Sequence, residues 1–426
     1  MRCCYIIIVI IKFLIGKKST RALRLRKSLE HLGPIFVKLG QMLSTRTDLL
    51  PEDIIQELGC LQDSVAPFKS SIAVQTVEQQ FRAPISAIFK EFDVEPMAAA
   101  SIAQVHRAIL LTGEKVIVKI LRPKIKQQAK RDINLLSNIV MFIAILWPPF
   151  RKLKLKQLVI EFYKTIHDEL DLTREAANGS LLRHNSSKLA PFLYIPQIYW
   201  QYTTEKVLVM EYISGIAIAN TTELNKHNVN LTYLAEIVIK IFFTQAFQDC
   251  FFHADLHPGN ILVDITNRQI PKLVLVDFGI TGSLNKRDQE YLAQNFMALF
   301  QRDYNKLAEL HVHSGWLPAD ANVNDFAASM RFVCEPMFAQ ALVERSIGKT
   351  LAQLLATAAK FKINIQPQLI LLQKTLLSIE GLVRLLDPQL DLWQTASPVL
   401  EDWMRQQSSV KVLLNRAING IKELLP

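Results

Sequence analysis

The segment HADLHPGN, His253–Asn260, places a carboxylate and an amide five positions apart. An aspartate such as Asp255 can accept or orient a hydroxyl proton, and Asn260 can turn its carbonyl oxygen toward Mg²⁺. A plain turn explains the same residues, with Asp255 as a cap and Pro258-Gly259 reversing the chain. Taken alone, the segment leaves both interpretations open.

A second polar motif, Asp277-Phe278-Gly279, lies seventeen residues after Asn260 and follows a predicted hairpin formed by ILVD and KLVLV. Protein kinases carry a catalytic aspartate, a metal-binding asparagine and a D-F-G aspartate in this order. A hard cation prefers oxygen ligands held on separate rigid segments. We therefore predict Asp255 as catalytic and Asn260 with Asp277 as the metal ligands.

Such a site also needs a lysine on a strand and a glutamate on a helix. Lys119 ends VIVK on the second strand of a predicted hairpin, AQVHRAILL and KVIVKIL around the turn TGE, where an ammonium can pair with phosphates. Further on, Asp171, Glu175 and Asn178 have the spacing of one helical face. We predict Glu175 as the partner of Lys119, with Glu169 as the alternative.

The elements that position these residues change along the chain. Residues 21–90 predict helices with a break at Gly33-Pro34, and a second pair of β-rich runs, YIPQIYW and KVLVMEYI, follows residue 194. Between the two strand pairs lie two long predicted helices, Lys124–Trp147 and Lys154–His184. After residue 285 the sequence predicts helices broken at Pro318, Pro336, Pro367 and Pro388.

This order predicts an α+β fold of two lobes, like that of a protein kinase. We expect a possible membrane-associating segment at 1–20 and a helical extension at 21–90. A small β-rich N-lobe with inserted helices should follow at 91–213, and a large helical C-lobe at 214–426.

The charge favours an anionic partner, because 49 basic against 39 acidic residues leave a formal charge of +10. No arginine-rich block with interleaved aromatic residues, zinc-finger spacing or RNP-like segment is present, so we expect no nucleic acid. The five cysteines are scattered without a C-x-x-C pair, which predicts neither disulfides nor a metal cage.

Two short apolar segments bear on membrane association. The N-terminal one is interrupted by Lys12, and Ile139–Trp147 is also shorter than the roughly 18 to 20 residues that span a bilayer. We expect the second to be core. The first, flanked by Lys17, Lys18 and Arg21, is expected to be either an interfacial anchor on an anionic membrane or a docked core helix.

Other candidate residues have ordinary explanations. His311 and His313 lack a third ligand nearby and are expected on a helix surface. Cys250 is expected to be a small buried apolar group, and His253 and His257 are expected to brace the loop backbone.

The chain resembles the UbiB/AarF family of atypical kinases from about residue 21 to about residue 405. VKLGQ matches the family's K-x-G-Q signature with Lys38 and Gln41, and PMAAASIAQVH is an alanine-rich loop where protein kinases carry glycines. ELD matches the E-x-D motif with Glu169 and Asp171, and MEY at Met210–Tyr212 matches the hinge.

The resemblance implies roles for these residues. Lys38, Gln41, Glu169 and Asp171 would be regulatory, in an extension that folds over the active site, and the alanine-rich loop would alter nucleotide preference. The residues implied to bind nucleotide are Met97, Ala98, Ala99, Ala100, Ser101, Ile102, Ala103, Gln104, Val105, Lys119, Glu211 and Tyr212.

The implied function is that of a Mg²⁺-dependent, ATP- or ADP-binding atypical kinase or ATPase that promotes ubiquinone (coenzyme Q) biosynthesis. The implied place is the cytoplasmic face of a bacterial inner membrane. Expected partners are membrane lipids or quinone precursors, other ubiquinone-biosynthesis proteins and a second copy of the chain. A small-molecule phosphotransferase and a nucleotide-gated scaffold without turnover are the alternatives.

Bacterial members of this family typically carry an apolar membrane-spanning region after the kinase-like part, whereas this sequence ends at NGIKELLP. We expect the N-terminal apolar stretch to provide membrane attachment instead.

Overall fold

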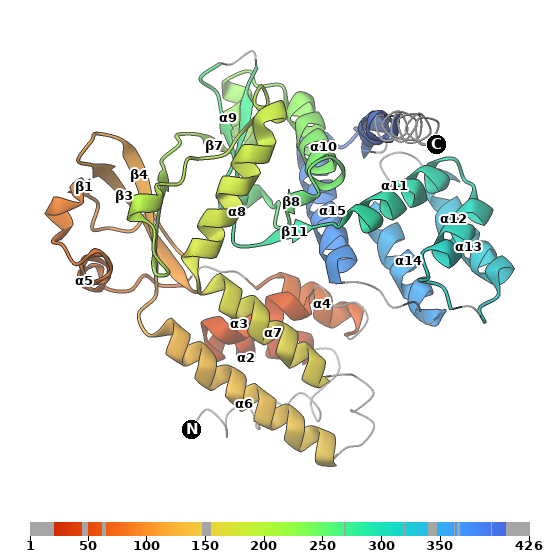
Figure 1. Cartoon of the computed structure of the whole chain (residues 1–426), viewed down its shortest axis with the longest axis horizontal. Coiled ribbons are helices and arrows are strands. Elements are labelled where there is room, and N and C mark those ends of the chain that lie inside the picture. Colours follow the sequence, from red (N-terminus) through yellow and green to blue (C-terminus); the bar gives the residue numbers. More distant parts are fainter. Residues whose placement is uncertain are drawn as a thin grey trace, which may run out of the picture. The chain divides into compact units, whose positions relative to one another are not determined.

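The computed structural model describes residues 21–44, 50–61, 65–146, 155–267, 270–318, 320–339, 347–361, 363, 367–392 and 394–405 (Figure 1). The chain forms two compact units. Unit 1 is Met1–Ser180 with Pro196–Tyr212, and unit 2 is Leu181–Ile195 with Ile213–Pro426.

Unit 1 combines helices with one sheet. Its helices are α2 (Arg21–Leu32), α3 (Pro34–Leu43), α4 (Glu52–Gly59), α5 (Ser70–Phe81), α6 (Ile125–Leu146), α7 (Leu155–Glu169) and the first part of α8 (Leu172–Asn185). Its strands are β1 (Phe89–Phe92), β2 (Ala98–Ala99), β3 (Ala103–Leu110), β4 (Lys115–Leu121) and β6 (Val207–Glu211). The antiparallel order is β1-β3-β4-β6, with β2 paired to β3. The 3₁₀ turns are η2 (Ile85–Ala87) and η5 (Trp200–Tyr202).

The predicted hairpin of β3 and β4 is confirmed. Along β4 the side chains alternate between a face that packs in the core and a face that carries Lys119. Val116, Val118 and Ile120 are fully buried and belong to a core that includes Ala73 and Val77 of α5. Because side chains alternate along a strand, the intervening Lys119 lies on the opposite face.

The helical extension has its own core. Leu29 of α2, Phe36 of α3 and Leu58 of α4 are buried together, with leucines of α6 packed against them. A Cβ on Gly40 would lie 2.3 Å from Leu61 Cδ1 and 2.8 Å from Leu29 Cδ1. The glycine of K-x-G-Q therefore lets these helices approach closely.

Unit 2 is mostly helical. It contains α9 (Thr221–Lys226), α10 (Leu231–Phe247), α11 (Lys286–Phe300), α12 (Tyr304–His313), α13 (Val323–Ala339), α14 (Ile347–Lys360) and α15 (Pro367–Leu386). The strands are β5 (Leu193–Tyr194), β7 (Ile216–Ala217), β8 (Phe251–His253), β9 (Ile261–Asp264), β10 (Lys272–Leu275) and β11 (Thr281–Ser283), with 3₁₀ turns η4 (Ser186–Leu189) and η6 (Pro258–Asn260). One sheet has the order β5-β10-β9-β7 and the other pairs β11 with β8.

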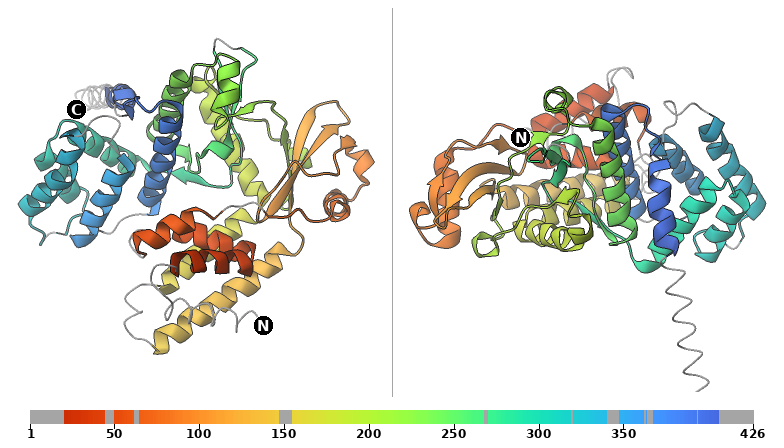
Figure 2. Two further views of the ribbon diagram at one scale, coloured as in Figure 1. Left: turned by 180° about the vertical axis from the view of Figure 1, so that it is seen from behind. Right: turned by 90° about the horizontal axis from the view of Figure 1, so that it is seen from above.

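Helix α10 is the centre of unit 2. Most of its side chains are buried, including Phe242, Phe243 and Phe247, and its first turn is capped by Asn230, whose side chain accepts from Tyr233 N. Helices α10 and α15 lie side by side (Figure 2). Strand β8, which leads into the predicted catalytic loop, follows α10 after three residues.

The α+β fold class and the β9–β10 hairpin are confirmed. The single helix predicted over Lys154–His184 is wrong, because α7 ends at Glu169 and α8 begins at Leu172. Asp171 Oδ1 accepts from the backbone N (3.0 Å) and Oγ1 (2.6 Å) of Thr173, a local capping turn that competes with helix continuation. Asp171 therefore precedes the helix and does not share a helical face with Glu175.

Two other predictions of secondary structure are corrected. KVLVMEYI contains β6 as predicted, but YIPQIYW is not a full strand: Tyr194 belongs to β5, which pairs in parallel with β10, and Ile198 forms only an isolated antiparallel bridge to Met210. Pro336 lies inside α13 instead of ending it. The carbonyl that loses its helical bond there belongs to Phe332, which is exposed, so water can satisfy it.

The core position predicted for Ile139–Trp147 is wrong in its described part, because Ile139 is only partly buried and Met141 and Phe142 of α6 are 61% and 62% exposed. Within the described ranges, no helix has the length and apolar character needed to cross a membrane. The N-terminal segment 1–20 lies outside the described residues.

Asp249 follows the C-terminal end of α10 in a partly buried position. Its Oδ2 has no hydrogen-bond partner among the described residues, and burial raises its pKa to about 6 despite the opposing influence of Lys188. The nearby helix C-terminus also disfavours a carboxylate.

We predict that Asp249→Asn stabilises the protein above pH 6. Because the pKa of this carboxyl is raised in the folded state, the folded protein loses stability as pH rises from about 4 to about 6. The asparagine variant has no carboxyl to ionise and does not lose this stability. The expected gain is about 1 kcal/mol at pH 8 after allowance for solvent screening. Thermal melts at pH 4 and pH 8 test this, with exposed Asp320→Asn as the control; an equal gain at pH 4 contradicts it.

Candidate active site

The predicted lysine–glutamate pair is present in unit 1. Lys119 Nζ on β4 lies 2.7 Å from Glu175 Oε1 and 2.9 Å from Oε2 on α8, and the two side chains are only 12% and 6% exposed. A charged pair this far from solvent must be geometrically well matched to offset its desolvation. Glu175, rather than the alternative Glu169, is therefore the partner of Lys119.

Glu169 instead pairs with the helical extension. Its Oε2 lies 3.5 Å from Lys38 Nζ on α3, and both side chains are largely buried. Gln41 of the same signature donates from Nε2 to Leu61 O at 3.2 Å. Lys38 therefore connects α3 to the E-x-D motif, and Gln41 connects α3 to Leu61, just after α4.

The alanine-rich loop is a tight turn between β2 and β3. Ala100 N donates to Ala103 O at 2.8 Å, and Met97 N donates to Val105 O at 2.8 Å. Arg122 holds the turn from outside, with Nε 3.0 Å from Ala100 O and Nη2 2.9 Å from Ala66 O. Arg122, which the sequence analysis did not single out, fixes both the loop and the segment that follows α4.

The strand register places the predicted nucleotide-binding residues Val105 and Gln104 on opposite faces of the sheet. Val105 pairs with Lys119 across β3 and β4, so both side chains lie on the same face of the sheet. Gln104 is fully buried on the other face, where Oε1 accepts from Phe68 N at 3.1 Å and Nε2 lies 2.8 Å from His106 Nε2. Its side chain supports the fold, which leaves its backbone for the predicted role.

The predicted hinge residues lie at the C-terminal end of unit 1. Glu211 Oε2 accepts from Gln197 N at 3.0 Å, and Tyr212 N donates to Lys115 O at 3.0 Å. The Arg107 guanidinium lies 5.2 Å from the centre of the Tyr212 ring. Nucleotide binding by Glu211 and Tyr212 stays a prediction.

In unit 2 the two histidines of HADLHPGN brace the loop, as expected. His253 Nδ1 accepts from Asp255 N at 3.2 Å, so Nε2 carries the hydrogen and faces Val276 O at 3.4 Å. Complete burial lowers the pKa of His253 and keeps the ring neutral. His257 Nδ1 accepts from Gly259 N at 3.0 Å.

Asp255 is held by a residue far along the chain. Lys374 Nζ on α15 donates to Asp255 Oδ1 at 3.0 Å, while His257 Nε2 lies 3.7 Å from Oδ2. The next residue, Thr375, donates from Oγ1 to Ala254 O at 3.0 Å. Helix α15 therefore fixes both the backbone and the carboxylate of the predicted catalytic loop.

The predicted metal ligands follow on the same hairpin. Asn260 Nδ2 donates to Asp255 O at 3.1 Å, which leaves its carbonyl oxygen as the atom suited to a cation. Asp277 has φ +63°, a left-handed conformation that is costly for a residue with a side chain, and its Oδ1 accepts from Gly279 N at 3.2 Å. Such local strain is characteristic of functional sites.

The donor set fits Mg²⁺ bound together with phosphates. Among the described residues, no group of three or more His, Cys, Asp and Glu side chains could hold a metal ion. One carboxylate and one amide oxygen, supplied by Asp277 and Asn260, are what Mg²⁺ takes from a protein when substrate phosphates and water complete its shell.

Comparisons with known proteins identify the family and the fold. Residues 60–311 match the model of the ABC1 atypical kinase-like domain, and residues 330–391 match the UbiB helical domain. A solved structure described as the complex of Rv3197 with erythromycin from Mycobacterium tuberculosis has a TM-score of 0.55 at 19% identity, over 84% of this chain and 90% of that one. The fold is therefore that of an atypical kinase.

Curated relatives narrow the assignment. Proteins named "Probable protein kinase UbiB" from Marinobacter nauticus and Azotobacter vinelandii are each 50% identical over 96% of this chain, covering 74% and 76% of their own lengths. The Pseudomonas aeruginosa protein of that name is 51% identical over 95% of this chain and 76% of its own. The chain belongs to the UbiB family of atypical kinase-like proteins.

Other candidate residues are placed as follows. Cys250 is partly buried, and burial raises the pKa of its thiol, which argues against a nucleophile. His313 is exposed as expected, but the surface position predicted for His311 is wrong. His311 packs among aromatic rings, at 4.9 Å from Phe326 between ring centres.

Lys374 was missed by the sequence analysis. It lies 119 residues from Asp255 in a helix whose other positions are mainly apolar, and no short motif marks it. The only signal in the sequence was a single charged residue within an otherwise uncharged, leucine-rich stretch, LILLQKTLLSI.

We predict that Lys119→Met lowers ATP turnover about 10²-fold or more, because it removes a charge aimed at the phosphates. It also leaves Glu175 buried without its partner, so the double variant Lys119→Met/Glu175→Gln is the better folded test. Lys115→Met, on the exposed end of the same strand, is the control. Equal turnover by the double variant and the control contradicts the assignment.

We predict that Lys374→Met lowers kcat about tenfold with little change in KM for ATP, because Asp255 loses the group that orients its carboxylate. Lys374→Arg should restore part of the rate. Lys360→Met on α14 is the control for removal of a positive charge. A change confined to KM indicates instead that Lys374 contacts the nucleotide.

Proposed function

We propose that this protein binds ATP with Mg²⁺ and hydrolyses it in support of ubiquinone biosynthesis, at a membrane surface. The observation that carries the proposal is the bidentate pair of Lys119 with Glu175. The pair fixes an ammonium on the face of the sheet that it shares with Val105. This placement suits a phosphate clamp, and the name of the relatives, UbiB, is the basis for the link to ubiquinone.

The residues of unit 2 suit the transfer step. Asp255, oriented by Lys374, would accept or direct the proton of an attacking water or hydroxyl. His253 would keep the loop in place without changing its charge, because burial holds it neutral. Bound Mg²⁺, held by Asn260 and Asp277, would neutralise the charge on the transferred phosphate.

Water is the acceptor we favour. The helical extension is tied into unit 1 through Lys38 and Glu169, and its connecting segment is held against the alanine-rich turn by Arg122. Because Arg122 holds the segment after α4 against the predicted phosphate-binding loop, this side of the loop is covered within its own unit, which disfavours a bulky protein substrate there. Hydrolysis coupled to the handling of lipids or of biosynthetic enzymes is the reaction that fits.

A membrane surface fits one face of α7. Ile160 and Tyr163 are each 49% exposed, and Lys156 and Lys164 lie exposed one turn to either side of Ile160. Apolar side chains flanked by lysines are typical of a helix that lies at an anionic membrane interface. Met141 and Phe142, exposed near the end of α6, add further apolar surface in the same unit.

We predict that purified protein hydrolyses ATP only with Mg²⁺, and faster with anionic than with neutral liposomes, because the exposed lysines of α7 attract anionic headgroups. Asp277→Asn should abolish turnover by weakening the metal site. Ile160→Asn/Tyr163→Asn should lose the stimulation and keep the basal rate.

Two results would contradict parts of this proposal. ATP binding without turnover under any condition favours a nucleotide-gated scaffold. Phosphate transfer to a small molecule in place of water favours the phosphotransferase alternative. A charge-neutral control, Thr165→Ser on the exposed side of α7, should leave liposome stimulation unchanged.

A further inference from the structure

Residues 65–68, which follow α4 and precede α5, run along the alanine-rich turn. Val65 N donates to Ala99 O on β2 at 3.4 Å, and Phe68 N donates to the buried Oε1 of Gln104 on β3 at 3.1 Å. These two bonds attach the segment to both strands that flank the turn. Residues 65–68 therefore help to shape the turn, although they lie outside the motif that carries it.

Arg122 joins this segment to the turn with a single side chain. Its Nε donates to Ala100 O at 3.0 Å, while Nη2 donates to Ala66 O at 2.9 Å and to Val65 O at 3.4 Å. Its backbone N donates to Ile102 O at 2.8 Å. Because a guanidinium is planar and presents its donors in fixed directions, it can hold carbonyls of two segments at once.

The charge of Arg122 is not neutralised by a carboxylate. Within the described part of the chain its side chain forms no ion pair: its bonds go to carbonyl oxygens, and the guanidinium lies 5.7 Å from the centre of the Phe68 ring. Burial lowers the pKa of the guanidinium, but an arginine remains charged at neutral pH. A positive charge beside the turn therefore favours an anion there.

Inside the turn, one buried polar group is left for a ligand. Ser101 is fully buried, and its Oγ has no hydrogen-bond partner among the described residues. It lies between Ala100 and Ile102, the two residues whose carbonyls Arg122 holds. Buried hydroxyls normally have a partner, so an unpaired one in a predicted phosphate-binding turn suits a phosphate oxygen as its acceptor.

We propose that Arg122 is a positioning residue for the nucleotide: it fastens the alanine-rich turn to residues 65–68 and so holds the turn in the shape that receives phosphates. Arg122 bonds the outside of the turn and acts through Ser101 and the turn backbone. Because the turn is ordered before the nucleotide arrives, binding costs less conformational entropy. The effect on ATP rests on the proposed function, whereas the fastening of the turn does not.

The same contacts couple nucleotide occupancy to the helical extension. Phosphates that order the turn also order residues 65–68 through Arg122, and these residues follow α4 in the chain. Linkage between two binding events is reciprocal, so a change in the extension that pulls residues 65–68 away from the turn weakens phosphate binding by the same factor.

The test measures binding of ATP with Mg²⁺ and of adenosine to the full chain by calorimetric titration. Arg122→Lys keeps the charge but loses the guanidinium that bonds two segments at once. We expect this variant to bind ATP about tenfold more weakly and adenosine equally well, because adenosine has no phosphate to meet the turn. Arg122→Gln, which also loses the charge, should weaken ATP binding further.

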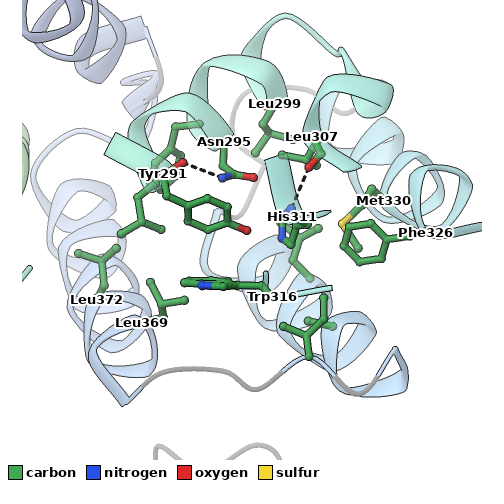
Figure 3. A pocket seen from close by; sticks show the side chains of 15 residues that line it. Tyr291, Asn295, Leu299, Leu307, His311, Trp316, Phe326, Met330, Leu369 and Leu372 are labelled. Carbon is green, nitrogen blue, oxygen red and sulfur yellow. Dashed lines mark hydrogen bonds between the residues drawn. The ribbon is translucent and has the colours of Figure 1, made fainter. Parts of the chain in front are cut away.

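Two controls separate this effect from general ones. Arg131→Lys is the same substitution at an exposed site on α6 of the same unit. Phe326→Leu removes a buried ring of unit 2, whose centre lies 4.9 Å from that of the His311 ring, and lowers stability without touching the turn (Figure 3). Both should keep the wild-type ratio of ATP affinity to adenosine affinity.

Hydrogen exchange reads the fastening directly. Without nucleotide, Arg122→Lys should speed exchange in residues 65–68 and 98–102. Saturating ATP should slow exchange in residues 65–68 of the wild type but not of this variant.

Each part of the proposal can be overturned separately. Equal weakening for ATP and adenosine, or wild-type ATP affinity in Arg122→Lys, overturns the positioning role. Unchanged exchange in Arg122→Lys overturns the fastening. A wild type that binds no ATP contradicts the proposed function and the nucleotide part of this proposal, while exchange without nucleotide still decides the fastening.

Discussion

The structure of unit 1 depends on bringing a lysine and a glutamate 56 residues apart into direct contact away from solvent. Neither charge is tolerable there alone, since an unpaired buried ion costs several kcal/mol. Strand β4 must therefore present Lys119 on the face opposite its valine core, and α8 must begin early enough to bring Glu175 alongside. The capping turn at Asp171, which separates α7 from α8, sets that starting point.

The same turn links the site to the extension. Glu169, at the end of α7, pairs with Lys38, so the two ends of E-x-D serve different neighbours: the glutamate anchors α3, and the aspartate starts α8. Gly40 allows α3 to approach its neighbours closely enough for this arrangement. The K-x-G-Q and E-x-D signatures therefore also serve helix packing and helix capping.

In unit 2 the main constraint is the position of the loop His253–Asn260. The predicted catalytic loop must hold Asp255 and Asn260 in fixed positions. A loop, however, has few backbone hydrogen bonds of its own. Buried His253 bonds the loop from inside, and Lys374 and Thr375 of α15 hold it from the side. Helix α15, which follows the kinase-like part, therefore directly supports the predicted catalytic loop.

The sequence by itself determined the β3–β4 and β9–β10 hairpins, the long α6 and the pairing of Lys119 with Glu175. These follow from local alternation, turn residues and motif order, which are properties of neighbouring residues. Only the tertiary structure decided that Gln104 faces the core, that His311 packs against Phe326, that Leu193–Tyr194 joins β10, and that Lys374 reaches Asp255. Each of these depends on contacts between segments distant in sequence, and neither helical nor strand periodicity encodes which distant segments will meet.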